Sequence, residues 1–295
     1  MILSICTSKS RRHQNSRVMN LAPCSCNSMN AQPFDHFLLT RFSVPRPRGD
    51  IPPEEWFARR FDLFETFCVP SVRDQACHGF RWSLLVGSST PTWVIDRLLS
   101  LGFPETDLVV TDEWRGGQAL QQWLTRFGEH GRVLTSRVDS DDALSHDYVS
   151  RLHAKLSHQV NTAYNFPKGL QLTPSGLLRV RSVTGPFVSL LSDYSAADLS
   201  VLAYDHDTIS KVINTTQLGG GPAWLQVIHN QNLSNVPDGI PTWPNRYQDQ
   251  FSVPLPRGFY NPIKYLRDVR IAPRLAARTR RFFRVNLRTR DQRAQ

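Results

Sequence analysis

The feature that most constrains the fold is an alternation of short apolar runs with amphipathic segments between residues 37 and 138. The strand-like runs are 37–42, 80–86, 108–111 and 132–138, and apolar residues recur at helical spacing in 54–67, 91–101 and 118–127. Strands that alternate with helices need crossover connections, and these connections produce a parallel sheet with helices packed on it. The sequence therefore predicts an α/β fold with a Rossmann-like first half.

Beyond residue 160 the alternation ends. The runs 171–173 and 177–183 flank Pro174-Ser175-Gly176, a turn typical of an antiparallel hairpin. Residues 186–228 mix strand-like and helix-like patterns. We therefore expect a mixed sheet flanked by helices.

Three helix boundaries can also be predicted. Pro70 is expected to end the helix at 54–67, and Thr90 is expected to cap the helix at 91–101. Ser145 is expected to cap a further helix, whose apolar face would be formed by Val149, Leu152, Leu156 and Val160.

The positive charge of the chain lies mainly at its two ends. The net charge is +10, of which residues 1–33 contribute +4 and residues 264–295 contribute +9, so that residues 34–263 carry −3. A polyanion therefore need not be the substrate of the central part. We expect a disordered leader at 1–33, one α/β domain at 34–263, and a basic tail at 264–295 with an imperfect amphipathic pattern.

The sequence favours a cytoplasmic protein. It lacks any run of about 18 consecutive apolar residues, and the apolar residues 1–6 precede Lys9 and Arg11, the reverse of the order in a secretory signal. The five cysteines are an odd number without CxxC spacing, which argues against a disulfide framework and a zinc knuckle. The basic tail suits peripheral contact with the anionic inner face of the cytoplasmic membrane. The alternative is a solvated, disordered basic tail, and nucleic acid is a less expected partner.

An acidic cluster follows directly after the strand-like run 132–138. It consists of Asp139, Asp141 and Asp142. Open parallel sheets bind ligands at the carboxyl ends of their strands, so a binding site is expected here. Adjacent carboxylates repel one another unless a cation or hydrogen-bond donors compensate them, and a divalent ion that also holds phosphate oxygens is a natural compensator. The alternative is a solvated loop in which Asp142 or Asp147 caps the next helix.

Two histidines and two arginines are further candidates. His229, after the strand-like run 224–228, can supply a metal ligand or a phosphate contact, and His206 is a weaker candidate for the same role. Arg41 is placed to meet a base or ribose, and Arg137 to contact a phosphate or orient Asp139. The structural alternatives are a hydrogen-bonded polar histidine for His229, solubility at a strand end for Arg41 and an ion pair for Arg137.

A general base for an acceptor hydroxyl should be a carboxylate on the far side of the substrate, and Asp193 is our candidate. The run Gly219-Gly220-Gly221 lacks the Lys-Ser/Thr ending of a phosphate loop, and we interpret it as a mobile connection.

Six segments between about Phe37 and Asn235 form a recognisable set of motifs. They are Leu39–Phe42, Arg60–Glu65, Cys68–Gln75, Phe80–Trp82, Ser136–Ala143 and Trp224–Asn235. Together they resemble the bacterial rhamnosyltransferase family of GT-A type glycosyltransferases. In such enzymes an Asp-x-Asp motif holds Mg²⁺ or Mn²⁺ against the diphosphate of a nucleotide sugar, which the resemblance places on Asp139 and Asp141.

The resemblance implies a metal-dependent enzyme that moves a sugar, with rhamnose as one candidate, from a nucleotide-diphosphate donor to a glycan or lipid-linked acceptor. The implied ligands of Mn²⁺ or Mg²⁺ are Asp139, Asp141 and His229. The implied nucleotide-sugar site comprises Thr40, Arg41, Phe42, Arg137, Asp139 and Asp142. The alternative is a non-catalytic protein that binds a nucleotide sugar, or a polyanion through its Arg-rich tail. An enzyme should gather Asp139, Asp141 and His229 around one pocket.

Overall fold

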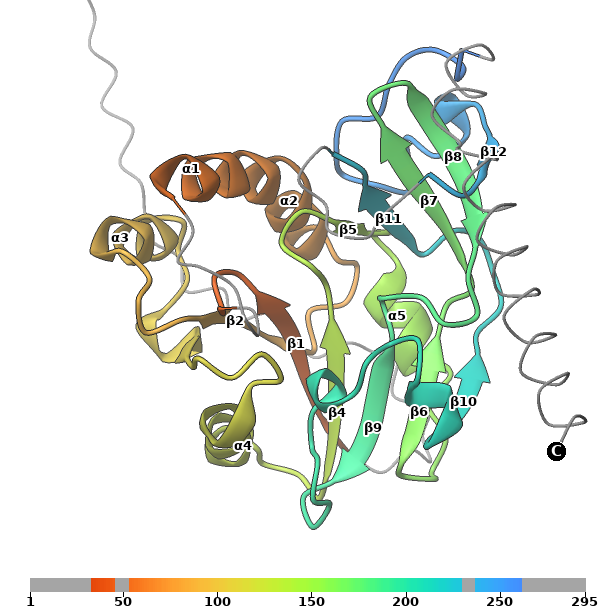
Figure 1. The fold of residues 1–295 in the computed structure, drawn as a ribbon. Helices are drawn as coiled ribbons and strands as arrows, with labels where there is room; N and C mark the ends of the chain where they lie inside the picture. The colour runs from red at the N-terminus through yellow and green to blue at the C-terminus, as the bar shows by residue number, and fades with distance from the viewer. Residues whose placement is uncertain (1–32, 46–52, 230–236, 262–295) are drawn as a thin grey trace, which may run out of the picture.

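The computed structural model describes residues 33–45, 53–229 and 237–261. Its strands form two mixed sheets with helices packed on them (Figure 1). The seven-stranded sheet has the order β10 (Asn214–Gln217), β6 (Thr162–Asn165), β9 (Ser189–Asp193), β4 (Arg132–Arg137), β1 (Asp35–Arg41), β2 (Arg81–Val86) and β3 (Leu108–Val110). The predicted α/β fold with a mixed sheet flanked by helices is confirmed.

The first four strands of the large sheet are parallel. β1 pairs with both β2 and β4, and β2 pairs with β3, all in parallel register. Their carboxyl ends therefore meet at one edge of the sheet. β9 then lies antiparallel between β4 and β6, and this reversal places the end of β9 at the opposite edge.

A second, five-stranded sheet adjoins the first in the order β12 (Ile240–Pro241), β8 (Gly176–Arg181), β7 (Lys168–Thr173), β11 (Trp224–Val227) and β5 (Ala143–Leu144). The predicted hairpin is confirmed, because β7 and β8 pair in antiparallel register across Pro174 and Ser175. β5 pairs with β11, so the chain that leaves β4 enters the second sheet at once (Figure 1).

The first helical region runs further than predicted. α1 (Glu54–Leu63) continues through a π-helical turn at Phe64–Cys68 into α2 (Val69–Arg73), so Pro70 does not end the helix. Pro70 directly follows the π turn, where the regular i→i−4 ladder of hydrogen bonds is already interrupted. The missing N–H of Pro70 is therefore tolerated.

The other two cap predictions are wrong. α3 (Thr92–Ser100) follows Pro91 without a side-chain cap, and Thr90 instead hydrogen-bonds to Ser43, with 2.8 Å between their hydroxyl oxygens. α5 (Tyr148–His153) follows Asp147, which accepts a hydrogen bond from the Ser145 hydroxyl at 2.7 Å. Because α5 ends at His153, the expected apolar positions at 156 and 160 lie beyond the helix.

Helices cover both faces of the parallel strands. On one face Phe57, Phe61 and Phe64 are buried, spaced four and three residues apart, and pack in the core cluster that contains Leu38 of β1. α4 (Gly117–Arg126) contributes to a separate cluster on the other face. Burying each such phenylalanine stabilises the fold by about 1.5–3 kcal/mol. These two layers fix the carboxyl edge of the sheet.

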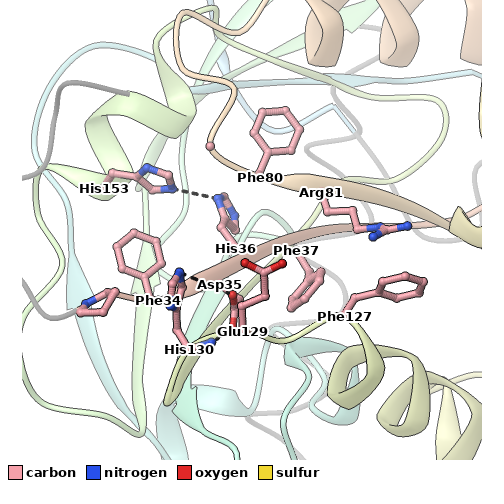
Figure 2. A pocket seen from close by; sticks show the side chains of 12 residues that line it. Phe34, Asp35, His36, Phe37, Phe80, Arg81, Phe127, Glu129, His130 and His153 are labelled. Atoms are coloured by element: carbon pink, nitrogen blue, oxygen red, sulfur yellow. Dashed lines mark hydrogen bonds and ion pairs between the residues drawn. The ribbon is translucent and has the colours of Figure 1, made fainter. Parts of the chain in front are cut away.

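A cavity of about 410 Å³ lies at the amino end of β1 (Figure 2). Its lining includes Asp35, His36, Arg81, His130 and His153. Asp35 begins β1 and Arg41 ends it, so a strand of roughly 20 Å separates the cavity from the carboxyl edge where the acidic cluster follows β4. The cavity is therefore separate from the candidate site at that edge.

Two histidines at this cavity form a buried pair. The His36 Nδ1 and His153 Nε2 atoms are 2.9 Å apart, and His36 Nε2 lies 2.9 Å from the Ser136 hydroxyl (Figure 2 shows the histidine pair). Burial, and then the charge of His153, lower the pKa of His36 well below its usual range, and burial lowers the pKa of His153 to about 4. Both rings are therefore neutral at pH 7.

This pair predicts a loss of stability in mild acid. A histidine whose pKa is lowered by folding binds fewer protons in the native state than in the unfolded state, so stability falls as the pH falls. His153 alone should remove about 2–3 kcal/mol from the free energy of unfolding between roughly pH 7 and pH 4. Urea unfolding across this range measures the slope. His153→Gln keeps a donor toward His36 without titrating and should flatten the slope; an unchanged slope would contradict the assignment.

The sequence also raises expectations about membrane spans, cysteines and the two chain ends. Within the described residues, no helix has the length and apolar character needed to cross a membrane. Cys68 is a free, buried thiol, whereas Cys77 takes part in a disulfide, which the odd cysteine count did not lead us to expect. The expected leader, apart from Pro33, and the expected tail at 264–295 lie outside the described residues.

Candidate active site

The acidic cluster lies in the turn that joins β4 to β5, at the carboxyl edge of the parallel strands. Leu39 pairs with Arg137 in the register of β1 and β4, so Arg41 at the end of β1 reaches the level of Asp139. Parallel pairing therefore brings together two residues that lie far apart in the sequence.

Asp139 is held by two arginines. Its Oδ1 accepts a hydrogen bond from the Arg137 guanidinium at 3.2 Å, and the Arg41 guanidinium lies 3.8 Å away. Burial acts to raise the pKa of Asp139, but the positive charges of Arg137 and Arg41 outweigh it and hold this pKa below the usual value. The Asp139 side chain remains 37% exposed, which limits the effect of burial. Asp139 is therefore an ionised carboxylate that orients both arginines.

Arg41 is a buried cation at the edge of this cluster. Its guanidinium lies over the Trp114 ring, 3.9 Å from the ring centroid, and the Arg41 side chain is 11% exposed. Burial, and then the charge of Arg137, lower the pKa of Arg41 to about 10. Arg41 thus remains charged at neutral pH and is fixed in one orientation by stacking.

Arg60 is a third cation at the site, one that sequence reasoning missed. It extends from α1, donates to the Arg41 carbonyl at 3.5 Å, and has its buried Nε without a hydrogen-bond partner in the described structure. Burial lowers the pKa of Arg60, and Asp141 is the carboxylate that most opposes this shift. The helical spacing in the sequence could have indicated Arg60, because it follows Phe57 by three residues and so lies on the helix face that packs against the sheet.

Asp141 pairs with His229 across the two sheets. The His229 Nε2 and Asp141 Oδ2 atoms are 2.9 Å apart, and their side chains are 17% and 14% exposed. His229 reaches this position because it follows β11 by two residues. Of the predicted metal ligands, the structure thus brings Asp141 and His229 together, whereas Asp139 faces the arginines.

Asp142 has a different environment from the one predicted. Its Oδ1 accepts a hydrogen bond from the Val227 backbone N–H at 2.8 Å, and the residue is 2% exposed. Burial, and then the charges of Asp141 and Asp139, raise the pKa of Asp142 well above its usual range. Asp142 therefore fastens β11 to the cluster, and its predicted contact with a nucleotide sugar stays a prediction.

Thr40 and Phe42 are buried at the end of β1, and their predicted contact with a nucleotide stays a prediction. The Thr40 hydroxyl accepts a hydrogen bond from the Trp82 indole at 3.0 Å, and the Phe42 ring packs 4.9 Å from the Phe61 ring. Successive side chains of a strand point to opposite faces, so Arg41 lies on the other face of the strand from Thr40 and Phe42.

Asp193 and His206 are not part of the cluster. Asp193 pairs with Arg132 at the start of β4, which leaves roughly 16 Å of strand between it and the end of β4. Its Oδ1 instead accepts a hydrogen bond from the Ser195 backbone N–H at 2.9 Å. His206 donates from Nδ1 to the Thr184 carbonyl at 3.0 Å. Asp193 is therefore at the wrong edge of the sheet to act as the base.

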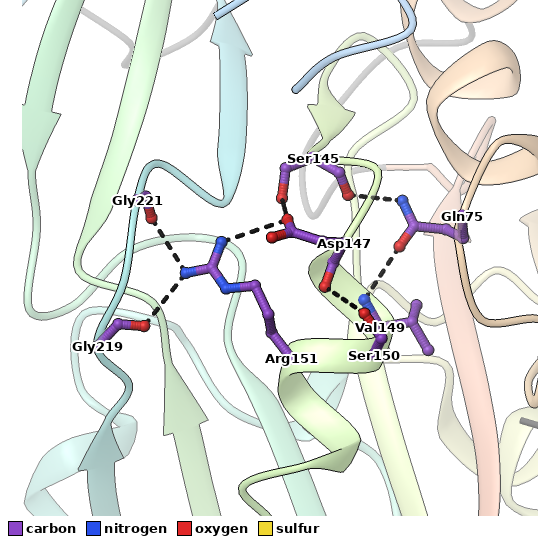
Figure 3. A network of polar contacts seen from close by, with 8 residues as sticks. All are labelled: Gln75, Ser145, Asp147, Val149, Ser150, Arg151, Gly219 and Gly221. Carbon is purple, nitrogen blue, oxygen red and sulfur yellow. Dashed lines mark hydrogen bonds and ion pairs between the residues drawn. The ribbon is translucent and has the colours of Figure 1, made fainter. Parts of the chain in front are cut away.

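A polar network holds the two sides of the site together (Figure 3). Arg151 donates to the carbonyls of Gly219 and Gly221 at 3.2 and 3.1 Å, and to Asp147 at 3.4 Å. Gln75 holds the segment between β5 and α5, which contains Asp147, by donating to the Ser145 carbonyl at 2.8 Å. The glycine-rich run, interpreted from sequence as a mobile connection, is thus anchored just before β11. This anchoring fixes the segment that enters β11, the strand that leads to His229.

The donor atoms of Asp141 and His229 suit a divalent cation. Residues 33–45, 53–229 and 237–261 contain no group of three or more His, Cys, Asp or Glu side chains arranged to hold a metal ion. A carboxylate oxygen and an imidazole nitrogen nevertheless fit a divalent transition-metal ion such as Mn²⁺, whose remaining positions phosphate oxygens and water can fill. The arrangement is therefore compatible with a cation bound together with its substrate.

Comparison with known proteins identifies the family. The model of one family, described as putative rhamnosyl transferase, matches residues 50–239. No curated protein matches the chain. Among solved structures, the inositol-1-phosphate CTP transferase from T. maritima is 12% identical with a TM-score of 0.36, over 69% of this chain and 94% of that chain. S. aureus TarS 1–349 is 11% identical with a TM-score of 0.36, over 65% of this chain and 60% of that chain.

The family match covers more than half of the chain. It includes Arg60, the acidic cluster and His229, the residues that the fold gathers at the carboxyl edge of β1 and β4. On this match the chain belongs to the rhamnosyl transferase family and is a glycosyltransferase.

Proposed function

We propose that the chain transfers a sugar, with rhamnose as the first candidate, from a nucleoside-diphosphate donor to a hydroxyl of a glycan or lipid-linked acceptor. The observation that carries the proposal is the convergence of Arg41, Arg60 and Arg137 on Asp139 and Asp141 at the carboxyl edge of the parallel strands. Open α/β sheets bind nucleotides at this edge.

The arginines would bind the diphosphate of the donor. Breaking the glycosyl phosphate bond develops negative charge on the departing nucleoside diphosphate, and guanidinium groups are suited to phosphate oxygens. Asp139 holds two of these cations in place before substrate arrives. Such preorganised donors stabilise a developing charge because little reorganisation is needed during the reaction.

A divalent cation, Mn²⁺ or Mg²⁺, would be held by Asp141 and His229 and would supply Lewis-acid stabilisation of the leaving diphosphate. The three arginines offer positive charge from the chain itself, so the contribution of a metal has to be measured. Hydrolysis of a panel of nucleoside-diphosphate sugars, with and without Mn²⁺, tests the proposal. Turnover of one donor that is lost in excess chelator is expected. No turnover of any donor would favour the alternative of a non-catalytic binding protein.

His229→Ala should separate a role at the site from a role in stability. We expect donor turnover to fall at least tenfold, because a candidate ligand is lost. The free energy of unfolding should fall by about 1–2 kcal/mol, because Asp141 loses a partner. His229→Gln is the matched control, since its amide can still donate to Asp141 and should restore stability without restoring turnover. Full turnover in both variants would remove His229 from the mechanism.

A further inference from the structure

Three large apolar side chains are exposed in the last described segment, residues 237–261. Ile240 is 63% exposed, Trp243 is 50% exposed and Phe259 is 40% exposed. The rings of Trp243 and Phe259 lie side by side, with 4.8 Å between their centroids. We refer to Ile240, Trp243 and Phe259 as the apolar patch. Neighbouring exposed aromatic side chains are typical of a surface that binds a protein, a membrane or a ligand.

Basic side chains accompany the apolar patch. Arg179 of β8 pairs with Ile240 in the strand register, and Arg181 lies directly opposite Lys168. All three basic residues are exposed, and none of them forms an ion pair within the described part of the chain. Like charges directly opposite each other destabilise a sheet. An anionic partner would offset this cost.

The course of the chain adds more positive charge. The described segment ends at Asn261, two residues after Phe259, and residues 264–295 carry eleven basic and two acidic side chains. We propose that the apolar patch and the basic row formed by Lys168, Arg179 and Arg181 dock this protein on the surface of an anionic phospholipid bilayer. Aromatic rings enter the interface while basic residues bind lipid phosphates.

The topology of the second sheet relates this surface to the candidate active site. β11, which leads to His229, is parallel to β7, and β12, which leads to Trp243, is antiparallel to β8. His229 and Trp243 therefore follow the same end of the sheet, separated by three strand spacings or roughly 14 Å. A membrane-bound acceptor would come within reach of the site. Only the statement about the acceptor rests on the proposed function; the docking on a bilayer does not.

Co-sedimentation of the full chain with vesicles tests the docking surface. Vesicles of equal parts phosphatidylglycerol and phosphatidylcholine should pellet the protein, and vesicles of phosphatidylcholine alone should pellet it far less. The double variant Trp243→Ala, Phe259→Ala should bind about tenfold more weakly at low and high salt. The double variant Arg179→Gln, Arg181→Gln should lose about tenfold at low salt only, because about 1 M salt shortens the Debye length to roughly 3 Å.

Val212→Ser is the matched control, because Val212 is 72% exposed outside the patch, and it should bind as the wild type does. Equal pelleting of the aromatic variant, or no pelleting of the wild type on anionic vesicles, would overturn the proposal. Binding of anionic vesicles only after truncation at Tyr265 would mean that the tail covers the patch in the full chain, and would also overturn it. If the aromatic variant binds vesicles as the wild type does but no longer transfers sugar to a soluble glycan, the apolar patch binds the glycan acceptor and not a bilayer. Donor hydrolysis without acceptor, measured in parallel, reports separately on the proposed function.

Discussion

Asp141→Asn is expected to lower turnover of the nucleotide-sugar donor by about 10²-fold or more, the cost of removing one strong electrostatic contributor at an active site. The asparagine keeps the shape of the side chain but removes the charge that faces His229 and Arg60. Steady-state donor hydrolysis over a range of Mn²⁺ concentrations measures the effect.

The stability of the Asp141→Asn variant should change little, because relief of the repulsion with neighbouring carboxylates offsets the weaker interaction with His229. Asp193→Asn is the matched control: it removes a carboxylate at the opposite edge of the sheet and should leave turnover unchanged. Unchanged turnover in Asp141→Asn would refute the role of Asp141. Full wild-type activity in excess chelator would refute the metal and leave the arginines as the source of positive charge.

Trp224→Ala is expected to reduce the free energy of unfolding by about 3–5 kcal/mol, the usual cost of truncating a large buried aromatic side chain. Trp224 is 1% exposed, its ring is stacked on Phe187 with 4.8 Å between centroids, and its indole N–H donates to the Phe166 carbonyl at 2.8 Å. Urea unfolding followed by circular dichroism measures the loss. Trp224 begins β11, so its removal also loosens the strand that positions His229.

Two companion variants check the packing at Trp224. Trp224→Phe keeps an aromatic ring but loses the indole hydrogen bond, and should cost about 1–2 kcal/mol. Gly169→Ala adds a methyl group that would come within 2.2 Å of the Trp224 ring, so it should also be strongly destabilising. A loss below about 1 kcal/mol in both Trp224→Ala and Gly169→Ala would show that this region is loosely packed.

The first half of the fold and the location of the site could be predicted from local sequence. Apolar runs and helical spacing are set by neighbouring residues, and parallel pairing then places the carboxyl ends of β1 and β4 at one edge. The sequence therefore placed the acidic cluster and Arg41 each at the end of a strand, and the parallel pairing of β1 with β4 brings these ends together. The family resemblance added His229, which local patterns alone left ambiguous between a site residue and an ordinary polar histidine.

Tertiary structure decided which face each candidate presents. β1 is apolar on both faces because helices cover both sides of the sheet. Its sequence pattern therefore could not show that Thr40 and Phe42 are buried while Arg41 reaches Asp139. The amphipathic pattern of α1 placed Arg60 near the sheet but did not show that Asp141 is the carboxylate that most opposes the lowering of its pKa.

Chain direction and long-range pairing were also settled only in three dimensions. The antiparallel placement of β9 carries Asp193 to the opposite edge, a reversal without a local signal in the strand itself. Asp141 and His229 lie 88 residues apart and meet because β5 pairs with β11. The sequence alone determined which segments form the parallel strands and helices, and that a carboxylate cluster ends β4. The contacts of that cluster depend on strand order and side-chain direction, which arise from packing between segments distant in the chain.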